Sequence, residues 1–228
     1  MIDYILPTFG RAKTHLPVFL NSLRETADAP DDVHITAVVH HGDKETIDLL
    51  NSWPSISIVE ENEKEPHLAF FMNLGYQNSK GDILGYIGDD FCHVTPGWDS
   101  IVQDALTQNK WQLITGPDSY LGNEGCPTFF FCRRALVEAV GEFVAPWMRK
   151  EGTDVMWARI MGPLNLVCWE PRLTFSHNHS TRFNSDDTFR RLQQVEAPNL
   201  NDKKFWAYVR KAQANIAAAV LHDRKGGI

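Results

Sequence analysis

Cysteine is scarce in this chain of 228 residues, and the four cysteines lie far apart in the sequence. No Cys-x-x-Cys pair occurs, so the spacing of a zinc site or of a disulfide framework is missing. We therefore expect four free thiols that pack as small apolar groups, at Cys92, Cys126, Cys132 and Cys168.

Long hydrophobic runs are also missing. No apolar stretch reaches the roughly 18 residues that a transmembrane helix needs, and residues 1–4 lack the basic flank and apolar run of a signal peptide. Internal repeats and low-complexity segments are absent as well. These absences favour a cytoplasmic protein, and a composition of 43% hydrophobic and 22% charged residues favours one substantial globular domain.

Positive charge is in deficit, with 22 Lys and Arg against 29 Asp and Glu. The deficit is uneven, because residues 1–180 hold 13 basic and 24 acidic residues whereas residues 181–228 hold 9 and 5. A basic end on an acidic body suits contact with phosphate, in a nucleic acid, a lipid head group or a phosphorylated ligand. A solvated helix face that docks on the acidic body explains the same pattern, and both interpretations stay open.

The first half of the chain alternates strand patterns with helix patterns, which predicts an α/β fold with a mostly parallel sheet and helices on both faces. Apolar runs predict strands at 2–6, 34–39, 56–59 and 83–87. Helical spacing predicts helices at about 16–26, 44–51 and 67–79.

The second half is less regular. We predict helices at 98–106, 134–140 and 153–161, and short strands at 113–115, 166–169 and 173–175, with a further apolar run at 128–132. A polar linker then leads to a long helix near 203–222, so a helical extension ends the chain.

Two adjacent carboxylates follow the strand predicted at 83–87, in the sequence Gly88-Asp89-Asp90. Open α/β sheets bind ligands at the carboxyl ends of their strands. Adjacent carboxylates repel unless a cation lies between them, and a hard divalent ion with oxygen ligands suits such a pair. Aspartates after a strand also serve as turn residues, so the pair alone does not decide the function.

Several short motifs, in order and spacing, resemble the family 2 glycosyltransferases over about residues 2–180. They are Ile5-Leu6-Pro7-Thr8-Phe9-Gly10-Arg11, Ala69-Phe70-Phe71-Met72-Asn73-Leu74-Gly75, Gly81-Asp82-Ile83-Leu84-Gly85-Tyr86-Ile87-Gly88-Asp89-Asp90, Pro96-Gly97-Trp98, Phe130-Phe131-Cys132-Arg133-Arg134-Ala135-Leu136, Val140-Gly141-Glu142-Phe143, Gly152-Thr153-Asp154 and Ser176-His177. The resemblance implies the Rossmann-like GT-A fold and a nucleotide-sugar donor.

The same resemblance implies a metal site for Mn²⁺ or Mg²⁺. Asp90 matches the last aspartate of the family's D-x-D motif, and His177 matches its late histidine, with His179 as a substitute. Gly88 departs from the motif, so Asp89 is expected at the donor ribose, at a metal-bound water or as a replacement ligand. A hydrogen-bonded core histidine is the alternative for His177.

Asp154 stands where the family has its catalytic carboxylate, so the resemblance implies a general base that takes the proton of the acceptor hydroxyl. A helix cap is the alternative for Asp154. Trp157, three residues further along the same helix face, is either a wall for a sugar ring or a core residue.

For the nucleotide, the resemblance points to Pro7, Thr8 and Arg11, and to Asn73 near the pyrophosphate or sugar. Many relatives carry an aspartate for uracil where this chain has His40. Three explanations stay open: His40 acts through its acceptor nitrogen, backbone groups recognise the base, or the base is not uracil. A zinc site at His40-His41 would need a third ligand that the sequence does not place nearby.

Together these features predict a GT-A domain over 1–180, with a nucleotide-sugar half at about 1–98 and an acceptor half at 99–180, followed by a basic helical extension over 181–228. The expected reaction is transfer with inversion, from a UDP-sugar rather than a GDP-sugar. The acceptor is a saccharide, a polysaccharide precursor, a protein or a hydroxylated DNA base. A nucleotidyltransferase and a catalytically inactive sugar-binding protein are the alternatives.

Overall fold

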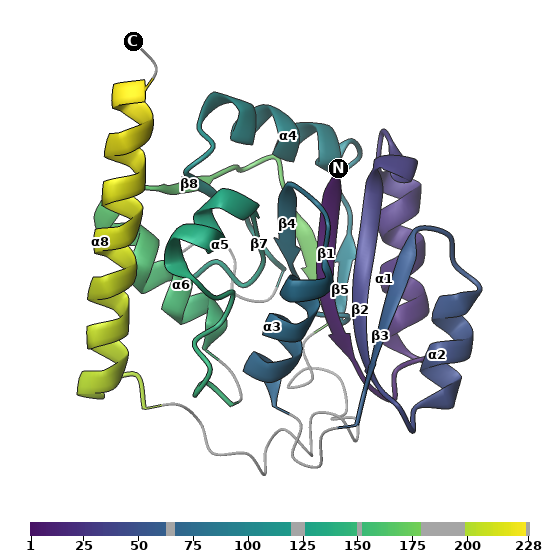
Figure 1. Cartoon of the computed structure of the whole chain (residues 1–228). Helices are drawn as coiled ribbons and strands as arrows, with labels where there is room; N and C mark the ends of the chain where they lie inside the picture. Colours follow the sequence, from purple (N-terminus) through teal and green to yellow (C-terminus); the bar gives the residue numbers. More distant parts are fainter. Residues whose placement is uncertain (63–66, 120–125, 150–151, 179–198, 227–228) are drawn as a thin grey trace.

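The computed structural model describes residues 1–62, 67–119, 126–149, 152–178 and 199–226. A seven-stranded sheet with the order β3-β2-β1-β4-β7-β6-β8 forms its centre, and helices cover both faces (Figure 1). The predicted α/β class with a mostly parallel sheet and a C-terminal helix is therefore confirmed.

The first four strands run parallel to one another. The central strand β1 is apolar and buried almost throughout, as expected for a parallel strand that is covered on both faces. These strands are β1 (Ile2–Thr8), β2 (Val33–His40), β3 (Ile56–Glu61) and β4 (Ile83–Tyr86). Helices α1 (His15–Thr26), α2 (Lys44–Asn51) and α3 (Leu68–Asn78) connect them, with a 3₁₀ turn at Pro30–Asp32.

The second half extends the sheet beyond β4. Strand β7 (Phe130–Arg133) lies antiparallel to both β4 and β6 (Leu113–Thr115), and β8 (Val167–Trp169) pairs parallel with β6. Helices α4 (Trp98–Gln108), α5 (Arg134–Val140) and α6 (Thr153–Met161) accompany these strands, and a 3₁₀ turn at Gly162–Leu164 follows α6.

A separate two-stranded sheet joins β5 (Phe91–His93) to β9 (Phe175–His177) in antiparallel register, with Phe91 opposite His177. The predicted strand at 173–175 is thus wrong by two residues, because Phe175 to His177 find partners on β5. Strand β5 itself was not predicted, since Phe91-Cys92-His93 is short and follows a turn directly.

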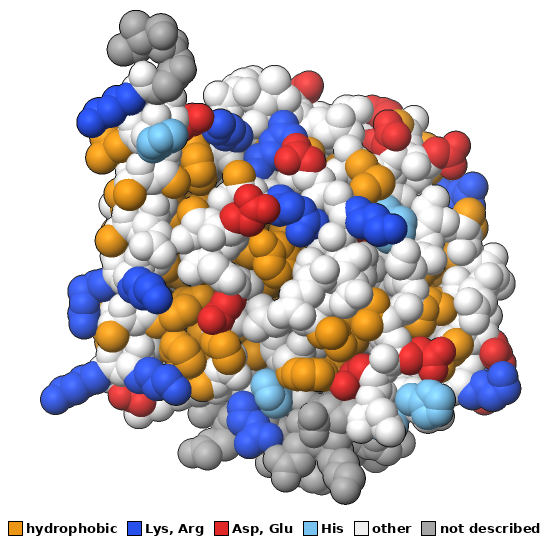
Figure 2. Space-filling view, in the orientation of Figure 1, with side chains coloured by type: hydrophobic (Ala, Val, Ile, Leu, Met, Phe, Trp, Pro, Cys, Tyr) orange, Lys and Arg blue, Asp and Glu red, His pale blue; other side chains and the backbone are white. Residues whose placement is uncertain are grey.

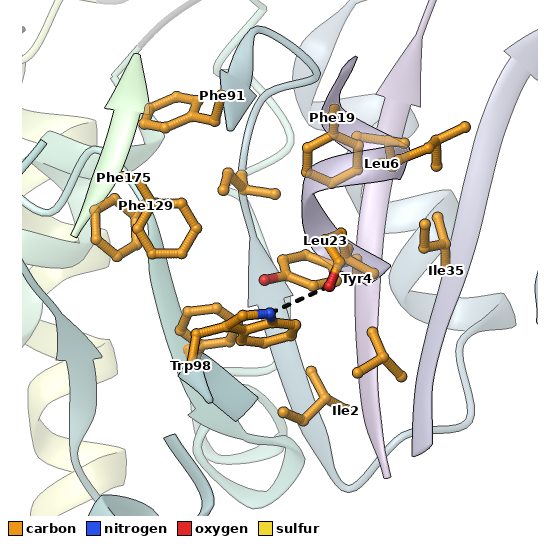
Figure 3. Close-up of a cluster of buried hydrophobic side chains, with 14 of the residues drawn as sticks. Ile2, Tyr4, Leu6, Phe19, Leu23, Ile35, Phe91, Trp98, Phe129 and Phe175 are labelled. Atoms are coloured by element: carbon orange, nitrogen blue, oxygen red, sulfur yellow. Dashed lines mark hydrogen bonds between the residues drawn. The ribbon is translucent and has the colours of Figure 1, made fainter. Parts of the chain in front are cut away.

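Two hydrophobic clusters form the core, one on each face of the sheet. Figure 3 shows part of the first cluster, in which Tyr4 of β1 lies among Phe19, Leu23 and Trp98. Trp98 donates its indole Nε1–H to the backbone oxygen of Leu23 at 3.3 Å, so the buried polar end of this ring has a partner.

Helix α8 (Lys203–Gly226) belongs to the second cluster. It packs on α5 and α6 through four side chains at helical spacing, Phe205, Val209, Ala212 and Ile216, each at most 2% exposed. Among the described residues, no helix is both long enough and apolar enough to cross a bilayer. The boundary between a domain at 1–180 and an extension at 181–228 stays a prediction, because residues 179–198 lie outside the described part of the chain.

A buried carboxylate anchors the amino end of β1. Asp3 is fully buried and accepts hydrogen bonds from the Thr36 hydroxyl at 2.9 Å and from the backbone N–H of Lys80 at 2.8 Å. His34 Nδ1 lies 3.1 Å from Asp3 Oδ1, the same oxygen that accepts from Thr36. Burial raises the pKa of Asp3, but the hydrogen bonds and the charge of His34 outweigh burial, so the net pKa is lowered.

We expect Asp3→Asn to lower the free energy of unfolding by about 2 to 4 kcal/mol at pH 7, because an amide places donors against donors. The exposed control Asp32→Asn should change it by less than about 0.5 kcal/mol. Since the folded pKa is lowered, the contribution of Asp3 is complete above the unfolded value of about 3.9 and is lost as the pH falls toward the folded value. Urea unfolding at several pH values measures both effects; equal stability of the two variants would contradict this role.

Candidate functional site

The candidate site lies at the carboxyl edge of the sheet, where β1, β2 and β4 end. The chain leaves β1 toward β2 on one side, while β4 lies on the other, so this edge is a topological switch point of the kind that binds ligands. Thr8 ends β1, Arg11 follows it, and Asp89 and Asp90 follow β4.

Asp89 is buried, with an exposed fraction of 4%, and is held by residues at and just after the end of β1. It accepts a hydrogen bond from the Thr8 hydroxyl at 2.6 Å and forms an ion pair with the Arg11 guanidinium. Burial raises the pKa of Asp89, while Arg11 opposes this increase. Asp89, Thr8 and Arg11, all predicted to contact the donor, thus form one buried cluster that joins the ends of β1 and β4.

Asp90 is more accessible, with 18% of its side chain exposed. Its Oδ2 lies 3.9 Å from Arg11 Nη1, and its Oδ1 lies 3.9 Å from His177 Nε2. A Cβ atom at Gly88 would come within 2.5 Å of Asp90 Oδ1. Glycine in place of the first aspartate of the motif therefore leaves room for the Asp90 carboxylate in this position.

His177 reaches Asp90 because β9 pairs with β5. The imidazole stacks on the ring of Phe91 with a centroid distance of 3.8 Å and an interplanar angle of 19°. The backbone N–H of Asn178 donates to the Asp90 carbonyl oxygen at 2.9 Å, which joins the two segments again. The predicted pair of Asp90 and His177 is therefore brought together, whereas His179 lies outside the described residues.

A single ion fits between Asp90 and His177 by distance. Two ligand atoms that each lie about 2.1 Å from one ion are at most about 4.2 Å apart, and these two atoms are 3.9 Å apart. A carboxylate with an imidazole is a donor set compatible with Mn²⁺. Among the described residues, no group of three or more His, Cys, Asp or Glu side chains gathers as a metal site.

Asp118 is a neighbour of His177 that the motifs did not single out as part of this site. It follows β6, is 4% exposed, accepts a hydrogen bond from the Thr128 hydroxyl and places its Oδ2 3.7 Å from His177 Nδ1. A position just past a strand end is the one sequence signal that marks it. Its charge lies on the side of the imidazole opposite Asp90.

Asp154 lies in the first turn of α6, where the cap residue is Gly152 and no side chain makes a capping bond. Asp154 is therefore not the N-cap residue itself. Its Oδ1 accepts from the Val155 backbone N–H at 2.8 Å, and its Oδ2 accepts from the Cys126 thiol at 3.2 Å. Burial, and then Asp154, raise the pKa of Cys126 to about 12, so this thiol keeps its proton at neutral pH.

Asp154 also lies at the carboxyl edge of the sheet. Burial, and then the charge of Asp154, raise the pKa of Tyr86, the last residue of β4. Asp154, the candidate base, therefore lies in the same region as the residues that follow β4.

Asn73 and Trp157, both considered as ligand contacts, make hydrogen bonds to backbone groups of the protein. The Asn73 amide donates to the Val144 carbonyl oxygen at 2.7 Å and accepts from the backbone N–H groups of Phe143 and Val144 at 3.0 Å each. Trp157 is fully buried and donates to the Phe143 carbonyl oxygen at 3.0 Å, so it is a core residue and no wall of a sugar site.

His40 ends β2, beside the end of β1 that contains Pro7 and Thr8. Its Nδ1 accepts the backbone N–H of Gly42 at 3.1 Å, so its acceptor nitrogen is engaged within the loop. His41 instead faces Glu60, with its Nδ1 2.8 Å from the carboxylate. Among the described residues, no group of three or more potential zinc ligands forms at this pair.

No family model and no curated protein matches the chain by sequence. Solved structures do match. The mannosyltransferase PcManGT from Pyrobaculum calidifontis, solved with GDP-Man and Mn²⁺, matches 100% of this chain and 76% of its own, with a TM-score of 0.62 and 14% identity. The fragment 1–349 of S. aureus TarS, solved with UDP-GlcNAc, matches 94% of this chain and 66% of its own, with a TM-score of 0.67 and 10% identity.

The chain has the GT-A fold. Another TarS structure matches 78% of this chain with a TM-score of 0.61, and the match covers 37% of that chain. This chain thus spans little more than a third of that structure. Identities of 10% to 14% establish the fold, and membership of family 2 stays a prediction.

We expect Arg11→Met to lower the free energy of unfolding by about 3 to 5 kcal/mol, because it leaves the buried Asp89 carboxylate without its cation. The double variant Arg11→Met, Asp89→Asn should recover part of that loss, because no buried charge then lacks a partner. Arg24→Met removes an exposed arginine from α1 and serves as the control. Chemical unfolding of these four proteins and of the single variant Asp89→Asn measures the coupling; strictly additive losses would show that the pair does not stabilise the edge.

Proposed function

We propose that the chain is a metal-dependent glycosyltransferase that transfers a sugar from a nucleoside diphosphate sugar to an acceptor hydroxyl. One observation carries the proposal: Asp90 and His177, from distant segments, meet at 3.9 Å at the carboxyl edge of a GT-A sheet. Two structural neighbours with this fold, solved with GDP-Man and Mn²⁺ and with UDP-GlcNAc, support a nucleotide-sugar donor.

Asp90 Oδ1 and His177 Nε2 are the atoms that would hold Mn²⁺ or Mg²⁺. The bound ion supplies positive charge that stabilises the departing diphosphate. Asp118, on the other side of the imidazole, favours the tautomer that carries its proton on Nδ1, and this leaves the Nε2 lone pair directed toward the ion.

Asp154 is the proposed general base. Its carboxylate lies in the first turn of α6, where the helix dipole stabilises negative charge, and Cys126 and Val155 fix its orientation. In a single displacement the carboxylate takes the proton of the acceptor hydroxyl as that oxygen attacks the anomeric carbon, and the configuration inverts.

The donor half is formed by residues at and just after the carboxyl ends of β1 and β2. Pro7, Thr8 and His40 are the proposed contacts for the nucleoside, and Arg11 for the phosphates. Asn73 would act indirectly, because its amide holds the backbone at 143–144. A UDP-sugar is the proposed donor.

The acceptor is a saccharide or a hydroxylated base in DNA. Exposed basic side chains on α8 favour an acceptor that carries phosphate. Four of them lie in the first three turns of the helix, Lys203, Lys204, Arg210 and Lys211. Figure 2 shows several Lys and Arg side chains along the side of the molecule that α8 forms.

We expect Asp90→Ala to abolish Mn²⁺-dependent turnover of the donor while the melting temperature stays close to that of the wild type. His177→Ala should weaken Mn²⁺ binding by at least about tenfold, since loss of outer-shell partners alone costs that much. His179→Ala and His41→Ala are the controls and should bind Mn²⁺ normally. Donor hydrolysis and calorimetry with Mn²⁺ are the measurements.

Full turnover in excess chelator would contradict the metal prediction. Donor binding without turnover under any condition would favour a catalytically inactive sugar-binding protein.

We expect Asp154→Asn to lower turnover by about two to four orders of magnitude, the usual contribution of a positioned base. Donor affinity and melting temperature should barely change, because the amide oxygen can still accept one of the two hydrogen bonds. The exposed Asp104→Asn on α4 is the control. Transfer near the wild-type rate would exclude Asp154 and direct attention to Asp118, whose carboxylate lies near His177.

A further inference from the structure

A buried hydroxyl group without a partner lies next to the candidate base. Thr153 is the first residue of α6 and is 1% exposed. Within the described part of the chain, its hydroxyl makes no hydrogen bond. A buried polar group without a partner costs free energy, and native structures hold few of them. The Thr153 hydroxyl therefore points to a partner that binds from outside the protein.

Tyr86, the last residue of β4, lies on the same side of the sheet as Thr153. Its ring stacks on Phe130 with a centroid distance of 5.0 Å and an interplanar angle of 24°. Trp157 contacts the same Phe130 ring, with a centroid distance of 5.5 Å. Thr153 lies four residues before Trp157 and therefore shares its helix face. Tyr86 and the first turn of α6 thus pack around one aromatic ring.

The charges around the Tyr86 hydroxyl place it near both candidate carboxylates. Burial, then the charge of Asp154 and more weakly that of Asp90, raise the pKa of Tyr86. The Thr153 hydroxyl is close enough to oppose this increase, although it lacks the geometry of a hydrogen bond. The phenol therefore keeps its proton at neutral pH and can donate it. Two neutral hydroxyl groups thus lie beside two carboxylates.

We propose that the Tyr86 and Thr153 hydroxyls form a subsite that binds a hydroxyl group of the sugar being transferred. The proposal rests on the proposed function, in which Asp90 holds the ion at the diphosphate and Asp154 takes the acceptor proton. The sugar lies between these two carboxylates, because its anomeric carbon is bonded to the diphosphate and is attacked by the acceptor oxygen. A sugar hydroxyl both donates and accepts, so it can pair with both protein hydroxyls at once.

The test is calorimetric titration, in the presence of Mn²⁺, of UDP-glucose, UDP-N-acetylglucosamine and GDP-mannose, and of UDP and GDP alone. Tyr86→Phe keeps the aromatic stack and removes only the hydroxyl. It should bind the nucleotide sugar that the wild type prefers about threefold to tenfold more weakly, the effect of one neutral hydrogen bond. Its affinity for the matching diphosphate should stay unchanged, because the hydroxyl contacts only the sugar.

Thr153→Val removes the second hydroxyl and keeps the branched shape of the side chain. It should weaken binding of the same nucleotide sugar by a similar factor. Its melting temperature should equal that of the wild type or exceed it, because the hydroxyl that is lost has no partner in the free protein. A structural role for this hydroxyl predicts the reverse, namely a lower melting temperature and unchanged affinity.

Tyr76→Phe is the matched control, because Tyr76 lies beside Arg134 at the opposite, amino edge of the sheet. It should keep the wild-type affinity for the nucleotide sugar and for the diphosphate. An unchanged ratio of these two affinities in both Tyr86→Phe and Thr153→Val would overturn the subsite and leave the proposed function standing. Absence of binding by all five nucleotides would overturn the proposed function itself.

Discussion

The pairing of β5 with β9 is the interaction on which the candidate site depends. Both strands are three residues long, and a two-stranded sheet of this size has little stability of its own. Its stability comes from the aromatic core beneath it, where the rings of Phe129 and Phe175 lie 4.0 Å apart and Phe91 packs against both (Figure 3). The distance between Asp90 and His177 is therefore set by hydrophobic packing.

The two adjacent aspartates differ in burial and therefore in their partners. Asp89 is inside and paired with Arg11, so its charge is compensated by the protein. Asp90 faces outward, and the same guanidinium lies 3.9 Å from it. These two carboxylates and one guanidinium carry a net charge of about −1, and a divalent cation would complement that charge.

Sequence patterns predicted the sheet well where long apolar runs and helical spacing were present. Helix α2 was predicted with its observed bounds, and β1 to β4 within two residues at each end. Patterns failed where pairing between distant segments decides the structure. Nothing local in Phe91-Cys92-His93 reveals that Phe175 and His177 will lie opposite, so β5 was missed and β9 was shifted.

In the candidate site, too, sequence patterns predicted some features, while others depend on contacts between distant segments. Asp90 and His177 followed from the order of the motifs, but the burial of Asp89, the engagement of the Asn73 amide and the approach of Asp118 to His177 depend on tertiary contacts. The engagement of His40 Nδ1 depends on a hydrogen bond from its own loop, which forms only once the chain turns at Gly42.

Helix α8 sets the orientation of the chain end relative to the carboxyl edge. Its 24 residues span about 36 Å, and they run from the end of the molecule near the carboxyl edge to the opposite end (Figure 1). Residues 221 to 225 are all exposed and bury no part of the core. A tether attached at the carboxyl terminus would therefore hold the protein on a solid support with the candidate site turned toward the solution.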